Sequence, residues 1–94
     1  MELSAFKASL LNSDPPQNAS AYLQALWYDA KGKWDKAHKL IQDVDDKKAS
    51  WIHAFLHRKE GDTANADYWY RRAGKQIPDV SLEEEWRRIV TALI

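Results

Sequence analysis

Two histidines one helical turn apart are the residues of this chain best suited to chemistry. His53 and His57 stand in the stretch "HAFLHRKE", with Glu60 following on the same side, and imidazole nitrogens are common zinc ligands. Seven residues of helix rise about 10.5 Å, too far for His53 and Glu60 to bind one ion at about 2.1 Å. A zinc-protease helix also needs glutamate directly after the first histidine, where Ala54 stands. We therefore prefer partly buried histidines hydrogen-bonded within their hairpin, with a metal site at His53 and His57 as the alternative.

No other arrangement of residues indicates catalysis. The three glycines, Gly32, Gly61 and Gly74, lie far apart, so the chain has no glycine-rich phosphate loop. Carboxylates near predicted turns, such as Asp29 and Asp62, are better explained as helix caps or surface pairs than as general acids and bases. We predict no enzymatic activity and no cofactor.

The stretch "YWYRR" offers aromatic and basic side chains to a partner. Successive helical residues point about 100° apart, so Tyr68, Trp69 and Tyr70 cannot all face one molecule. We expect Trp69 and Tyr70 to pack inside. Tyr68 and Arg72, one turn apart, are expected to form a small exposed patch.

Composition limits the kind of partner. The chain has 94 residues, enough for one domain, and its 14 basic and 14 acidic residues cancel and are evenly spread. This balance argues against binding to nucleic acid or to a membrane surface. Because the chain has no cysteine, no apolar run of about 20 residues and no signal-peptide pattern, we expect a soluble cytoplasmic domain.

Apolar residues recur at helical spacing almost everywhere, which predicts a single all-α domain over residues 1–94. Asp14 before two prolines indicates the start of the second helix, Asp62 is the expected N-cap of the fifth, and Ser81 with Glu84 forms a capping box before the sixth. We predict six helices, at about residues 2–11, 15–31, 33–44, 49–60, 63–73 and 82–93.

The middle of the chain repeats itself. Residues 21–44, shifted by 29 positions onto residues 50–73, place small residues and glycines on their equivalents. Such self-similarity predicts two helical hairpins, at about residues 20–45 and 49–78. The aligned pairs include Ala25 with Ala54, Gly32 with Gly61, and Ala37 with Ala66.

These marks resemble tetratricopeptide repeats. The small residue early in the first helix, the turn glycine, the alanine where two helices touch, and Pro78 at the end all match that family's pattern, although the period is 29 rather than about 34 residues. The resemblance implies stacked antiparallel hairpins, with the first and last helices as caps, that bind a protein or peptide. Residues 53–74 also resemble small bacterial proteins to which we attach no activity.

The resemblance also implies where a partner binds. Family members grip ligands with side chains of each first helix, which correspond here to Tyr22, Leu26 and Asp29 and then to Trp51, Phe55, Arg58 and Lys59. Rings beside basic groups are typical of interaction hot spots. Alternatively, the first helix of the chain covers these rings. Self-association through the ending "IVTALI" would give a homodimer.

Overall fold

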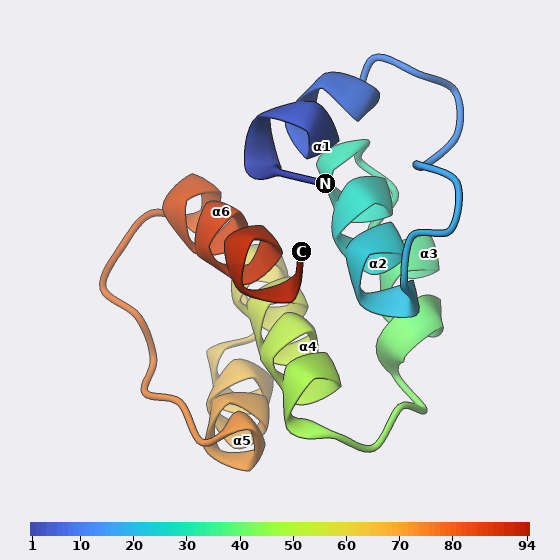
Figure 1. Ribbon diagram of the computed structural model, residues 1–94. Coiled ribbons are helices and arrows are strands. Elements are labelled where there is room, and N and C mark those ends of the chain that lie inside the picture. Colours follow the sequence, from blue (N-terminus) through green and yellow to red (C-terminus); the bar gives the residue numbers. More distant parts are fainter.

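The computed structural model describes residues 1–94 and contains six helices and no strand, which confirms the predicted all-α class (Figure 1). Helix α2 packs along α3, and α4 packs along α5, as two hairpins, while α6 lies against α4 and α2. None of the helices combines the length and apolar character needed to cross a membrane. The helices are α1 (Leu3–Ser9), α2 (Ala21–Ala30), α3 (Trp34–Ile41), α4 (Lys47–Glu60), α5 (Thr63–Ala73) and α6 (Leu82–Leu93).

The two hairpin turns have the same geometry. Gly32 and Gly61 both adopt left-handed backbone conformations, with φ of 80° and 90°. In each turn the amide after the glycine donates to the carbonyl five residues earlier, a hydrogen bond typical of helix ends closed by glycine. These bonds join Lys33 to Tyr28 and Asp62 to His57, each at 2.9 Å. The turns therefore match at positions 29 residues apart, as the repeat predicts.

Four of the six helix starts are set by capping side chains, at Ser20, Asp46, Asp62 and Ser81. The carboxylate of Asp46 accepts the Ala49 amide at 2.8 Å and begins α4 two residues before the predicted Ala49. The predicted N-caps of α5 and α6 are confirmed, because Asp62 accepts the Asn65 amide and Ser81 accepts the Glu84 amide. The return bond of the predicted capping box is not made, because the Glu84 carboxylate pairs with Arg87 and Arg88. Each such cap satisfies an amide that the first helical turn leaves unpaired.

The second helix starts later than predicted. It begins at Ala21, with Ser20 as its cap, so the interpretation of Asp14 and the prolines after it as a helix start was wrong. A short helix is stabilised mainly by packing of an apolar face. Because residues 15–19 contribute no fully buried side chain, extending α2 over them would gain little. The first helix likewise ends at Ser9, which leaves Leu11 91% exposed.

Tryptophan side chains join the helices. Four of the five indole N–H groups donate to a residue outside their own helix, so each ring buries its apolar body and still satisfies its polar atom. The stacked pair of hairpins is therefore joined to α1 and to α6 by specific bonds as well as by packing. The four bonds run from Trp27 to Ser9, from Trp34 to the Leu56 carbonyl, from Trp51 to Glu85 and from Trp86 to the Leu26 carbonyl.

Helix α6, rather than the first helix, covers the predicted binding face of α4. Ile89 and Val90 of α6 are fully buried, and Trp86 packs against Phe6 of α1 with ring centroids 5.9 Å apart. Helix α1 packs against α6, and its Lys7 lines the same pocket as Phe55 and Lys59 of α4. Helix α6 thus lies over the α4 rings that α1 was expected to cover in the alternative prediction.

Candidate functional site

The residues predicted to bind a partner lie on two helices, with Trp51, Phe55, Arg58 and Lys59 on α4 and the second predicted patch, Tyr68 and Arg72, on α5. Phe55 is only 1% exposed, whereas Tyr68 is 52% exposed and lies on α5. Trp51 is partly buried, and the Lys75 ammonium lies 4.1 Å from its ring centroid. The Phe55 ring is therefore covered, and Trp51 is only partly accessible.

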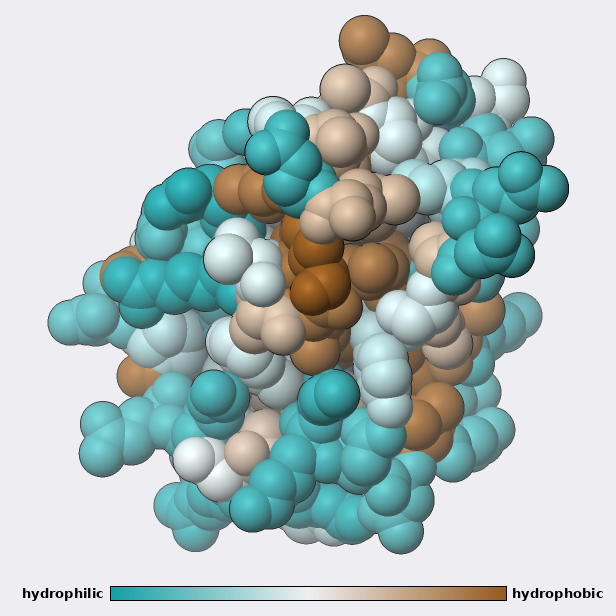
Figure 2. Space-filling view, in the orientation of Figure 1, coloured by the Kyte–Doolittle hydropathy of each residue, from teal (hydrophilic) through white to brown (hydrophobic).

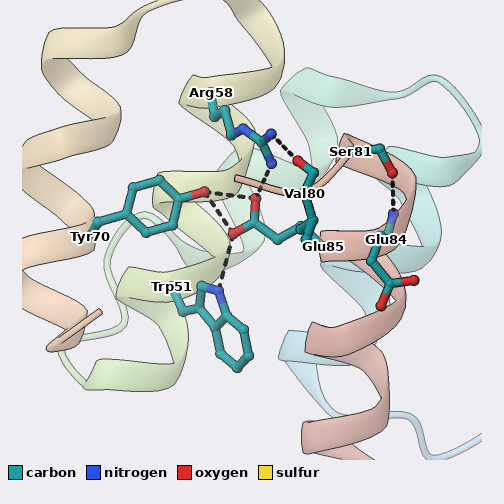
Figure 3. Close-up of polar contacts among 7 residues, drawn as sticks. All are labelled: Trp51, Arg58, Tyr70, Val80, Ser81, Glu84 and Glu85. Carbon is teal, nitrogen blue, oxygen red and sulfur yellow. Dashed lines mark hydrogen bonds and ion pairs between the residues drawn. The ribbon is translucent and has the colours of Figure 1, made fainter. Parts of the chain in front are cut away.

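Arg58 is used within the chain (Figure 3). Its guanidinium donates to Glu85 of α6 at 2.8 Å and to the carbonyl of Val80, and its side chain is 21% exposed. Both ends of its donor fork are therefore occupied within the chain, and a role of Arg58 in binding a partner stays a prediction. Arginine suits such a position because its planar group can bind two acceptors at once.

Glu85 is the centre of this network. Its carboxylate is 2% exposed and also accepts from the Tyr70 hydroxyl at 2.6 and 2.7 Å and from the Trp51 indole at 3.3 Å (Figure 3). Burial, and then the hydrogen bond to Glu85, raise the pKa of Tyr70, so its hydroxyl stays a donor. One carboxylate therefore ties together α4, α5 and α6.

Sequence reasoning missed Glu85, although a signal exists. Glu85 lies three residues after Leu82 and four before Ile89, so it belongs to the inward stripe of α6. A carboxylate on an apolar stripe predicts a buried partner. Glu84, the residue before Glu85, instead pairs with Arg87 and Arg88 on the surface.

A second ion pair joins the two hairpins. The Lys59 ammonium lies 3.2 and 3.1 Å from the two carboxylate oxygens of Asp29, which is 2% exposed. Burial raises the pKa of Asp29, and the charge of Lys59 opposes that rise. The interpretation of Asp29 as a cap or surface carboxylate was wrong, because α4 and Lys59 cover it.

Tyr68 and Arg72 stay together on the surface. The Arg72 guanidinium donates to the Tyr68 hydroxyl at 3.1 Å and pairs with Asp45 at 3.1 Å, and it also lies 5.0 Å from the Trp69 ring centroid. Tyr70 is buried and Trp69 partly buried, as expected. The pair is thus a small exposed feature whose charge is already matched by Asp45.

One open pocket lies where α1, α2, α4 and α6 meet. Its volume is about 320 Å³, within the range of ligand pockets. Two of the predicted residues line it, Phe55 at its floor and Lys59 at its rim. The other apolar lining residues are Leu10, Ala30, Leu82 and Trp86, and the charged ones are Lys7, the buried Asp29, Glu83 and Arg87.

The three histidines of the chain gather between α3 and α4. His38, which sequence reasoning missed because it lies on another hairpin, places its Nε2 2.9 Å from Nε2 of His53. One ring nitrogen from each of His38, His53 and His57 lies within 4.8 Å of the others. Both histidines of α4 were expected to hydrogen-bond within their hairpin. His57 does so, to Glu60 of its own helix at 2.5 Å, whereas His53 bonds to His38 of the other hairpin.

Two tryptophans flank this histidine cluster. Trp34 stacks on His38 with ring centroids 4.9 Å apart, and Trp69 stacks on His53 at 3.9 Å. Burial, followed by the neighbouring histidines, lowers the pKa of His53 to about 4, and burial also lowers the pKa of His38. Both rings are therefore neutral at pH 7.

The apolar ending of the chain is mostly used internally. Ile89 and Val90 are fully buried, while Ile94 is 41% exposed. Figure 2 shows an apolar area near the middle of one face, in the region where the C-terminus lies in Figure 1, with hydrophilic surface around it. Self-association through this ending stays a prediction.

No family model matches this chain, and no curated protein and no solved structure matches it either. The resemblance to tetratricopeptide repeats therefore also stays a prediction.

Proposed function

We propose that this chain is a non-catalytic interaction module that binds a peptide segment of a protein partner in the pocket between α1, α2, α4 and α6. The observation that carries this proposal is the pocket itself, an opening of about 320 Å³ with an apolar floor and a charged rim. Apolar concavities with a few polar groups at the edge are the usual sites of recognition.

The floor suits one large apolar side chain. Phe55, Leu82 and Trp86 offer apolar walls, and an aromatic side chain that buries its usual 150 to 250 Å² there would gain about 4 to 6 kcal/mol before ordering costs. Such an anchor is typical of helical proteins that hold short segments.

Two charges at the pocket are free to meet a partner. Lys59 already pairs with Asp29, and Arg87 pairs with Glu84, but Lys7 and Glu83 are exposed and take part in no ion pair. We therefore propose a segment with a carboxylate next to its apolar anchor, where the carboxylate meets Lys7. Electrostatic complementarity of this kind mainly adds specificity and speed of association.

Selection from a displayed random-peptide library tests the proposal. We expect enriched peptides to share an aromatic or leucine anchor beside aspartate or glutamate, and their affinities can be measured by fluorescence anisotropy. Ala30 is exposed at the pocket rim, so Ala30→Phe should fill the opening without removing a core contact and should weaken binding about tenfold or more, which corresponds to about 1.4 kcal/mol.

Ala64 provides a matched control. It is an exposed alanine on α5, away from the pocket, so Ala64→Phe makes the same chemical change elsewhere and should leave peptide affinity unchanged. Enriched peptides that bind wild type and Ala30→Phe equally would refute the pocket as the site. A library that yields no shared anchor would refute the peptide-binding function.

We also propose that the module is a short array of the tetratricopeptide kind, working in the cytoplasm. The matching turns at Gly32 and Gly61 support the array, and the lack of cysteine supports a reducing compartment. The exposed Ile94 supports a homodimer as a second mode of association. Sedimentation of wild type and Ile94→Asp would test the dimer, since only the wild type should associate.

A further inference from the structure

We propose that His38, His53 and His57 together bind one divalent transition-metal ion of the zinc class between α3 and α4. This inference is independent of the peptide pocket. It rests on the convergence of one ring nitrogen from each histidine to within 4.8 Å of the others. The three are all the histidines that the chain has, and they come from two helices in different hairpins.

The spacing is close to what zinc needs. Nitrogens bound to one zinc ion at about 2.1 Å in a tetrahedron lie about 3.4 Å apart. The Nε2 atoms of His38 and His53, now 2.9 Å apart, would have to separate by about half an ångström, and the third nitrogen would have to move inward. Small rotations of the three side chains supply movements of this size. Three imidazoles leave a fourth position for water, as in open zinc sites.

Glu60 prepares His57 for this role. Its carboxylate accepts from Nδ1 of His57 at 2.5 Å, which places the proton on Nδ1 and leaves Nε2 as the free lone pair. A carboxylate behind a ligating histidine is the usual arrangement around zinc, because it fixes the tautomer and the ring orientation. Nε2 of His57 has no hydrogen-bond partner within the chain, so its lone pair is free for an ion.

The hydrogen bond between the other two histidines must break for an ion to bind. It requires one Nε2 to donate and the other to accept, so binding of an ion requires one proton to move to Nδ1, which frees both Nε2 lone pairs for the metal.

A neighbouring group of residues is the rival site. His57, Glu60 and Asp62 also bring one ligand atom each within 4.8 Å, but two of the three are exposed carboxylates at the helix end. That arrangement is common without an ion. The two sites share His57 and differ in His38 and Asp62, which makes them separable by substitution.

Calorimetric titration of the metal-free chain with Zn²⁺, and with Co²⁺ as a spectroscopic probe, tests the proposal. We expect one ion per chain and the visible absorption of four-coordinate Co²⁺. We also expect Co²⁺ to quench tryptophan fluorescence, because Trp34 and Trp69 stack on two of the ligands. In the wild-type chain, the imidazole NMR signals of all three histidines should shift with Zn²⁺.

Three variants distinguish the outcomes. His38→Phe keeps a ring against Trp34 but removes a ligand, so affinity should fall more than about 100-fold, and Glu60→Gln should cost about tenfold. Asp62→Ser keeps a capping hydroxyl and should bind as wild type. If Asp62→Ser loses the ion while His38→Phe keeps it, the ion lies at the rival site and the proposal is wrong.

The wild-type spectra keep the test independent of folding in the variants. Helicity of each variant is checked by circular dichroism without metal. If His38→Phe fails to fold, the imidazole signals of the wild type decide: a shift confined to His57, or no shift at all, would overturn the three-histidine site.

Discussion

Replacing Glu85 by alanine should destabilise the fold more than replacing any other charged residue of α6. Glu85 is 2% exposed and accepts from Arg58, Tyr70 and Trp51. Removing one partner of a buried ion pair costs about 3 to 5 kcal/mol, because the other charge is left unpaired. The Arg58 side chain is 21% exposed and can still reach water, so we expect about 3 to 4 kcal/mol.

This loss is large for a domain of this size. A chain of 94 residues has a free energy of unfolding of about 5 to 14 kcal/mol, so Glu85→Ala should remain folded at 25 °C. Its melting temperature should fall by about 12 to 30 °C, since each kcal/mol shifts a domain of this length by about 4 to 8 °C. Urea denaturation followed by tryptophan fluorescence should show a lower midpoint with an unchanged slope.

A double-mutant cycle with Arg58→Ala isolates the pair. If Arg58 and Glu85 interact as the 2.8 Å contact indicates, the double variant should be more stable than the sum of the single losses predicts, by about 1 to 3 kcal/mol. Glu84→Ala, on the same helix but paired only with the exposed Arg87 and Arg88, should hardly move the midpoint. Losses that add to within about 0.5 kcal/mol would refute the network as a stabilising unit.

Two further predictions concern the ends of α4. The Ala49 amide and then the Tyr22 hydroxyl lower the pKa of Asp46 below 3.8. The stability that ionised Asp46 adds is therefore present above that pH and is lost as the pH falls through the folded pKa. Asp46→Asn, which keeps the cap, should lose less stability in acid, as measured by urea denaturation between pH 5 and pH 2. Gly61→Ala should lower the free energy of unfolding by about 1 to 2 kcal/mol. Because φ is 90° there and nothing lies within 4 Å of an added Cβ, the cost is conformational. Gly32→Ala, at the equivalent turn, should cost about the same, and unequal losses would contradict the equivalence of the two hairpins.

The features that could be predicted from the sequence are those coded by neighbouring residues. Gly61 with Asp62 specifies a helix end and the next cap within a few positions, and Ser81 does the same for α6. The order of burial in "YWYRR" follows from helical rotation alone, with Tyr70 buried and Tyr68 exposed. Such signals need no knowledge of what packs against the helix.

The sites could not be predicted, because each depends on helices that are distant in sequence. His38 meets His53 only because α3 of one hairpin lies beside α4 of the next. Helical spacing shows that His53 and His57 share a face but cannot show which face of another helix opposes it. The metal hypothesis was accordingly limited to two ligands and Glu60, and geometry along a single helix argued against it.

The same dependence explains why a hot-spot pattern on α4 was misleading. Arginine, lysine and aromatic rings bind partners well because they pair with carboxylates and bury large areas, and these properties serve a small domain's own stability equally well. Here α6 presents Glu85 to Arg58, and α2 presents Asp29 to Lys59. A basic residue of α4 is thus available to a partner only where no internal carboxylate reaches it, and the exposed cation at the pocket rim without an ion pair is Lys7 of α1. We therefore expect a charged group of the partner to meet Lys7 of α1, while the charges of α4 hold the hairpins to each other and to α6.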